Sequence, residues 1–159
     1  MTVRTSSNCK LFIGPVAADT VDTEGEFEAL TPYVEVLQIQ NIGEFGDAAN
    51  DVSVAHLNDA RMQHYKGVYD AGVLNVVVSY DPATGSGQED LIAASQAPDN
   101  YAFKITLNDD LPGSPVQPTT FYFRGQVRSY RVNVGGSDQI ISANVEIGIN
   151  SAIITVAAD

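Results

Sequence analysis

Tryptophan is absent from this sequence of 159 residues, and cysteine occurs only once. A lone Cys9 cannot close a disulfide within the chain, which fits folding in a reducing compartment. A β-sandwich that binds sugars or a host receptor is expected to expose Trp and Tyr platforms. With no Trp and seven scattered tyrosines, the sequence disfavours such a binding module.

Residues that commonly carry catalysis or bind metals are also few. His56 and His64 are the only histidines, they do not form a His-Glu-x-x-His pattern, and Cys9 is far from both. No serine lies in a Gly-x-Ser-x-Gly elbow, and there is no phosphate loop or dinucleotide fingerprint. We therefore predict no enzymatic activity, no metal site and no cofactor.

Basic residues are scarce: eight Lys and Arg stand against twenty Asp and Glu, for a net charge of −12. No Lys or Arg lies between Lys10 and Arg61, a stretch that holds half of the acids. Binding to phosphates depends on Lys and Arg, so a role in gripping nucleic acid is disfavoured. The acidic stretch is either a solvated face that aids solubility or a surface that repels a polyanion.

Long apolar runs are missing as well, so no membrane insertion is expected, and Met1–Lys10 has no signal-peptide core. The charged share of 18% is below the usual quarter. Either other copies of the chain cover much of the surface, or the domain carries little charge by itself. The length suits a single domain over residues 1–159.

Most segments of the sequence have the residue pattern of β-strands. Tyr101–Asn108 alternates apolar and polar residues, and Val73–Tyr80 is almost wholly apolar, as in a core strand. The apolar phase of Tyr33–Ile42 slips between Val36 and Leu37, which indicates a bulge or burial on both faces. Further strands are expected at Lys10–Ile13, Phe121–Val134, Gln139–Ile147 and Ala152–Ala157. This pattern predicts a mainly β fold, a sandwich or barrel.

Two segments interrupt the strands. Ser86 and Glu89 match a capping box, which predicts one flanking helix over about 86–97, ended by Pro98. Residues 43–72 lack a long apolar period and form an unusually long connection between core strands. Loops longer than about 12–15 residues are usually functional or disordered. The segment Thr20–Pro32 reads as an ordinary polar connection.

The order and spacing of short motifs along nearly the whole chain resemble the major tail tube proteins of long-tailed (siphophage-type) bacteriophages and of phage-derived particles such as gene transfer agents. The motifs are Thr5-Ser-Ser-Asn8, Leu11-Phe-Ile-Gly-Pro15, Tyr33-Val-Glu-Val36, Ile42-Gly-Glu-Phe-Gly46, Lys66-Gly67, Asp70-Ala-Gly-Val-Leu74, Asp81-Pro82, Gly87-Gln88, Asn100-Tyr-Ala-Phe-Lys104, Thr120-Phe-Tyr-Phe-Arg-Gly125 and Ile147-Gly-Ile-Asn-Ser151.

The resemblance implies a β-sandwich or barrel of tail-tube type with a flanking helix. It also implies hexameric rings that stack into a hollow virion tail tube, assembled in the bacterial cytoplasm, with strands of each subunit lining an inner barrel. DNA would pass through the lumen without specific binding, and an acidic bore would repel it. Expected partners are other copies, a tape measure protein, a tail tip or initiator protein and a tail terminator. The alternative is the inner tube of a contractile tail or of a type VI-like secretion machine.

The resemblance also implies three groups of contact residues. The first is an inter-ring stacking loop, about 43–72, with Glu44, Phe45, Asp47, Leu57, Met62, Tyr65 and Lys66. The second consists of terminal arms, about 1–8 and 149–159, with Thr5, Ile149, Asn150 and Ile153. The third is Arg124, Arg128 and Arg131, where Arg124 and Arg128 are expected on one face of a strand and Arg131 on the other. We expect these arginines to pair with acids of the same or a neighbouring subunit.

Overall fold

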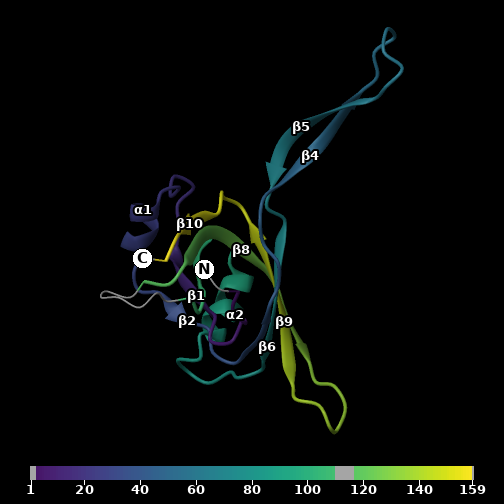
Figure 1. Ribbon diagram of the computed structural model, residues 1–159. Coiled ribbons are helices and arrows are strands. Elements are labelled where there is room, and N and C mark those ends of the chain that lie inside the picture. The colour runs from purple at the N-terminus through teal and green to yellow at the C-terminus, as the bar shows by residue number, and fades with distance from the viewer. Residues whose placement is uncertain (1–2, 110–116, 159) are drawn as a thin grey trace.

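The computed structural model describes residues 3–109 and 117–158. Figure 1 shows the elements of this part of the chain: β1 (Lys10–Val16), α1 (Glu24–Ala29), β2 (Val34–Glu35), β3 (Ile39–Ile42), β4 (Ala48–Val54), β5 (Gln63–Asp70), β6 (Val73–Ser79), α2 (Gln88–Gln96), β7 (Tyr101–Thr106), β8 (Thr120–Asn133), β9 (Ser142–Ile149) and β10 (Ile154–Val156). The expectation of a mainly β fold is confirmed.

One antiparallel sheet holds eight strands in the order β2-β1-β7-β8-β9-β6-β3, with β10 added to β8. Strand β8 belongs to both halves of this sheet. Its first part pairs with β7 up to Gly125, and its second part pairs with β9 from Gly125 to Asn133. The register shifts between Val127 and Ser129, where Arg128 is an extra residue on β8. A bulge of this kind bends a strand and increases its twist, so the two halves can face each other.

The main core lies between these halves. Leu11, Phe103 and Phe123 come from the first half and pack with Leu74 and Val145 from the second. The rings of Phe103 and Phe123 stack with centroids 5.4 Å apart. Helix α2 contributes Leu91 and Ala94 to the same cluster. The sandwich-type arrangement is as expected from the sequence, while the sheet stays open, because β2 and β3 occupy its two ends.

The shift in apolar alternation within Tyr33–Ile42 corresponds to a break between two strands. Strands β2 and β3 are separated by Val36–Gln38, and Gln38 has a positive φ of 62°. The fully buried Gln88 of α2 holds this joint. Its amide nitrogen donates to the carbonyls of Leu37 (3.1 Å) and Ser79 (2.8 Å), and its amide oxygen accepts from Asp81 N–H (3.0 Å) and the Tyr130 hydroxyl (2.9 Å).

The structure has a second helix that the sequence reading missed. Residues Glu24–Ala29 form α1 instead of continuing a polar connection. The Glu26 carboxylate accepts bonds from the backbone N–H and hydroxyl of Thr23 (3.0 and 2.9 Å) and from Asp22 N–H (3.0 Å). These bonds lower the pKa of Glu26, the bond from Asp22 most. Phe27 is the only fully buried residue of this six-residue helix, so no apolar period announced it.

The start of α2 also differs in detail from the expected capping box. The helix begins at Gln88, after Gly87 with φ 78°. The Ser86 hydroxyl accepts from Gln88 N–H (3.3 Å), and the Glu89 carboxylate accepts from Gly85 N–H (2.9 Å). Each contact is therefore one residue away from the expected partner, because the left-handed Gly87 is inserted at the cap.

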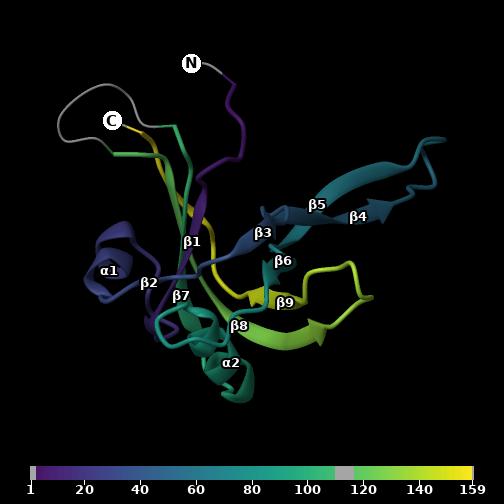
Figure 2. The ribbon, with the colours of Figure 1, turned by 90° about the horizontal axis from the view of Figure 1, so that it is seen from below.

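The long segment 43–72 is a β-hairpin rather than a loop. Strands β4 and β5 pair only with each other, in a two-stranded sheet. Figures 1 and 2 show this hairpin extending far from the rest of the chain. The expected arm from Ile149 is also wrong in its first part: Ile149 ends β9 and is buried, Ile153 packs against the main core, and β10 pairs with β8.

We predict that Gln88→Leu lowers the free energy of unfolding by about 2 kcal/mol, because it leaves partly buried carbonyl and hydroxyl partners unpaired. Gln96→Leu, at the exposed end of the same helix, is the matched control and should change stability by less than about 0.5 kcal/mol. Urea denaturation of both variants and the wild type measures the difference. Equal midpoints would show that Gln88 does not hold the joint.

Candidate functional site

Exposed apolar side chains are concentrated on two hairpins. Of the fifteen large hydrophobic residues exposed in the described part of the chain, seven lie on the β4–β5 hairpin and four around the turn between β8 and β9. The first group is Val52, Val54, Leu57, Met62, Tyr65, Val68 and Tyr69, and the second is Val132, Val134, Ile140 and Ile141. Contiguous apolar exposure of this kind marks interaction surfaces.

The β4–β5 hairpin has two different faces. The pairs Val52–Tyr65 and Val54–Gln63 share one face, which we call the apolar hairpin face. The pairs Ser53–His64 and Asp51–Lys66 share the other. There Nδ1 of His64 lies 2.9 Å from the Asp51 carboxylate. None of these residues joins the hydrophobic clusters of the described chain.

Most residues expected in the stacking loop lie on this hairpin or at its base. Leu57 is fully exposed near the tip, and Met62 and Tyr65 are also exposed. Lys66 lies on the side of the hairpin opposite the apolar hairpin face, while Glu44 and Asp47 are exposed on the segment between β3 and β4. The sequence reading missed Val52 and Val54, although the period-2 alternation of Asp51–Val54 could have revealed them.

Phe45 corrects the expectation for this group. Its ring lies edge-on to that of Phe121, with centroids 5.1 Å apart, and it packs against the main core. It therefore anchors the base of the hairpin to the chain's own domain. Its position in a polar segment gave no sign of this, because Phe121 is 76 residues away in sequence.

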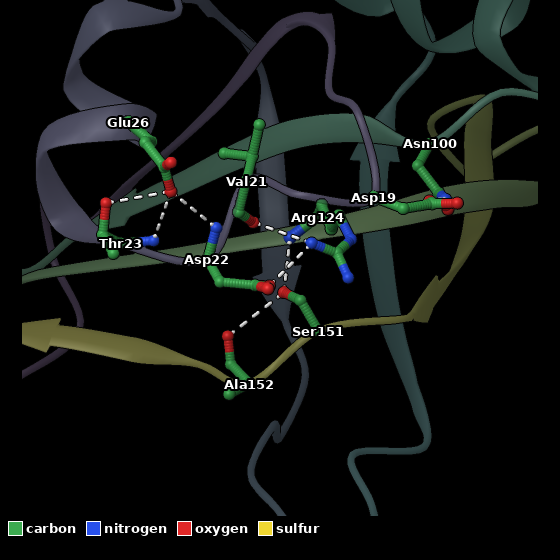
Figure 3. A network of polar contacts seen from close by, with 9 residues as sticks. All are labelled: Asp19, Val21, Asp22, Thr23, Glu26, Asn100, Arg124, Ser151 and Ala152. Atoms are coloured by element: carbon green, nitrogen blue, oxygen red, sulfur yellow. Dashed lines mark hydrogen bonds and ion pairs between the residues drawn. The ribbon is translucent and has the colours of Figure 1, made fainter.

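Arg124 occupies a site between helix α1 and the base of the hairpin. Its guanidinium donates to the Val21 carbonyl and to the Asp22 carboxylate, both at 2.7 Å, and its side chain is only 11% exposed (Figure 3). The hydroxyl of Ser151 accepts from the Arg124 backbone N–H at 2.9 Å. An adjoining hollow of about 500 Å³ also includes Asp47, Asp70 and Asn150 in its lining. Arg124 thus has an acidic partner within its own chain.

Arg128 and Arg131 lie on a different surface. The guanidinium of Arg128 covers Gly148, where a Cβ atom would lie 2.7 Å from Nε. Arg131 is the cross-strand neighbour of Asn144. The residues on either side of Asn144, Ala143 and Val145, are buried, so Asn144 and Arg131 lie on the opposite face of the sheet. Both arginines therefore point away from the main core. The expectation that Arg131 faces the other way is wrong, because the bulge at Arg128 shifts the alternation of β8 by one residue.

This surface, which we call the polar face, belongs to the half-sheet β3-β6-β9-β8. Its cross-strand pairs include Asn75–Glu146, Val77–Asn144 and Ser79–Ser142. Glu146 is the one acid on these four strands. Within the described residues, neither Arg128 nor Arg131 has a carboxylate within ion-pair distance.

The terminal residues divide into two groups. Thr5 is exposed on the segment that precedes β1. Asn150 is exposed but tied to the domain, because its side chain donates to that of Asn100 at 2.8 Å. Among residues 3–109 and 117–158, no group of three or more His, Cys, Asp and Glu side chains is placed to hold a metal ion. No helix in that part of the chain has the length and apolar character needed to cross a bilayer.

Similar architecture occurs in several solved structures. The anti-feeding prophage baseplate, described as 6-fold symmetrised, contains a chain with a TM-score of 0.66 and 12% identity, covering 99% of this chain and 98% of that one. A chain of the sheath/tube terminator of an extracellular contractile injection system in its extended state gives 0.67 and 10%, covering 99% of both. The SPP1 tail tube gives 0.64 and 9%, covering 94% of this chain and 76% of that one.

No protein-family model and no curated protein matches the sequence. The structural likeness extends over nearly the whole length at identities of 9–12%. The chain therefore has the fold found in phage tail tubes and related injection systems.

We predict that Phe45→Ala lowers the free energy of unfolding of the isolated chain by about 1–3 kcal/mol, since a partly buried ring is lost from the core. Tyr65→Ala, on the apolar hairpin face, should change it by less than about 0.5 kcal/mol. Thermal unfolding of dilute protein distinguishes the two. If both variants unfold with the wild type, Phe45 does not anchor the hairpin base.

Proposed function

We propose that this chain is a structural subunit that assembles with copies of itself into a hollow tube. The observation that carries the proposal is the β4–β5 hairpin, which projects from the domain with an apolar face that its own chain leaves uncovered. An isolated two-stranded hairpin is marginally stable in water, so a partner surface would stabilise it. The shared fold with the SPP1 tail tube supports a second copy as that partner.

The half-sheet β3-β6-β9-β8 supports the closure of copies into a ring. Its strands alternate in direction, and both end strands have an open edge: β3 pairs only with β6, and the second part of β8 pairs only with β9. Copies in a ring are related by rotation about an axis that runs roughly along the strands. This rotation leaves the up or down direction of each strand unchanged. Because the number of strands is even, β8 of one copy meets β3 of the next in antiparallel orientation, so identical copies can close a barrel.

The sixfold symmetry of the anti-feeding prophage structure supports six copies in each ring. In such a ring, the polar face would line the bore, because the opposite face of the half-sheet is buried in the main core. The expected acidic bore is revised accordingly: the half-sheet offers Arg128, Arg131 and Glu146 among amides and hydroxyls. DNA would pass this lining without specific binding if carboxylates of neighbouring copies neutralise the two arginines, because free guanidiniums bind phosphates.

Stacking of rings is assigned to the hairpin. A head-to-tail contact between different surfaces does not close along the axis and produces an open tube. The net charge of −12 keeps free subunits apart until complementary surfaces meet. The partners of such a tube would include a tape measure protein, an initiator at the tail tip and a terminator, in a virion tail assembled in the bacterial cytoplasm.

The inner tube of a contractile system is the second candidate. The similar chains from the anti-feeding prophage and the contractile injection system favour it. The two candidates differ in whether a sheath surrounds the tube. Binding of a sheath protein to preformed tubes would support the contractile system, and naked tubes in purified particles would support the long-tailed phage.

We predict that Val54→Asp abolishes tube formation while leaving the dilute monomer folded. A charge on the apolar hairpin face prevents its burial against another copy. Ser53→Asp adds the same charge to the adjacent position on the opposite side of the hairpin and is the matched control, which should still assemble. Electron microscopy of concentrated protein measures tubes, and hydrogen exchange should show residues 48–70 better protected in tubes than in monomers. Normal tubes from Val54→Asp would show that this face does not mediate stacking.

A further inference from the structure

Arg128 and Arg131 are the two exposed arginines of the half-sheet, and both lie beside its open edge on β8. Two other bases have partners within the chain. Arg124 pairs with Asp22, and Lys10 lies 3.6 Å from Glu35. Gly148 of β9 has no side chain, so the Arg128 guanidinium lies over it on the polar face, one strand inward from the open edge.

The opposite end of the same half-sheet is acidic. Strand β3 ends at Ile42 and is followed by Glu44 and Asp47, which are both exposed. The segment from Ile39 to Asp47 contains no Lys or Arg. Within the described residues, neither carboxylate has a base within ion-pair distance. Both acids line a shallow hollow of about 390 Å³ beside Ala71 and Val73, where the chain returns from the hairpin to β6.

We propose that Arg131 of one copy pairs with Glu44 of the next copy across the seam where β8 meets β3, and that Arg128 turns from Gly148 toward the same edge to pair with Asp47. This inference rests on the proposed ring and identifies its seam. In a closed barrel, strands tilt by about 35–45°, so the neighbouring edge is displaced by several residues along β8. The two arginines are three residues apart, and so are the two acids. Each pair spans at most about 11 Å of extended chain, so the two sets can match in length.

The charges also decide which edges can meet. If two β8 edges paired, arginines would face arginines, and if two β3 edges paired, Glu44 and Asp47 would face their own copies. Like charges placed together disfavour both symmetric dimers. Only the β8–β3 contact joins opposite charges, and this contact continues around a ring. The seam thus selects a ring over a two-fold dimer, although surface ion pairs are individually weak.

Charge exchange tests the seam. Arg131→Glu and Glu44→Arg, made separately, should each reduce the assembled fraction at least tenfold at low salt, and the combined variant should restore it toward the wild type. Sedimentation and electron microscopy at equal protein concentration measure assembly. Glu24→Arg, which makes the same charge change on α1, is the matched control and should assemble normally. Monomer unfolding midpoints confirm that each variant folds. If a reversal prevents folding, Arg131→Gln and Glu44→Gln replace it, and each should reduce assembly at low salt and reduce its dependence on salt.

The possible results distinguish a failure of the proposed seam from a failure of the proposed tube function. A wild-type protein that forms neither rings nor tubes under any condition contradicts the proposed function itself. Tubes from the wild type and from both single variants in equal amount overturn the seam alone. Failure of the combined variant to recover also overturns the pairing. If the Arg131 variants assemble normally but their tubes lose binding of a short DNA duplex, the arginines serve a polyanion, and the seam is wrong.

Discussion

The buried side chain of Gln88 holds together the parts of this domain on which its proposed assembly depends. A single amide reaches from α2 to the joint between β2 and β3, to the end of β6 and to Tyr130 on β8. Buried polar groups without partners are unfavourable, so the four bonds of this amide fix the positions of all these elements together. Among these elements are both open edges of the half-sheet. Their separation and direction are therefore properties of the folded core, and in the proposed ring a neighbouring copy would meet edges that are already positioned.

The same core leaves two surfaces without internal partners. The hairpin projects beyond the sheet with Val52, Val54 and Tyr65 on one face, while Phe45 ties its base to Phe121. Rigidity at the base and apolar exposure along the strands suit a segment that docks into another molecule, because docking then orders few additional residues. The acidic net charge opposes premature association of such surfaces. A balance of this kind fits a subunit that stays dispersed until an assembling end presents several contacts at once.

The similarity to the solved structures lies in the fold, because the sequence identities are only near 10%. An antiparallel half-sheet with an even number of strands can form a barrel from many sequences, provided that one face is apolar and the other is polar. The identities of the residues on the polar face are then free to differ. This freedom explains why the polar face here combines Arg128 and Arg131 with a single Glu146, although the chain as a whole is strongly acidic.

The sequence by itself determined the strands whose side chains sort by simple alternation, such as Tyr101–Thr106, and the break after Val36, because local patterning fixes which residues can share a face. It also identified residues 43–72 as exceptional. The sequence did not predict helix α1, because six residues with one buried side chain, Phe27, give no periodic apolar pattern. Only the tertiary structure decided that Phe45 and Ile149 belong to the core and that Arg131 shares a face with Arg128. The first result depends on contacts between residues distant in sequence, and the second on one extra residue in β8 that reverses the alternation after it.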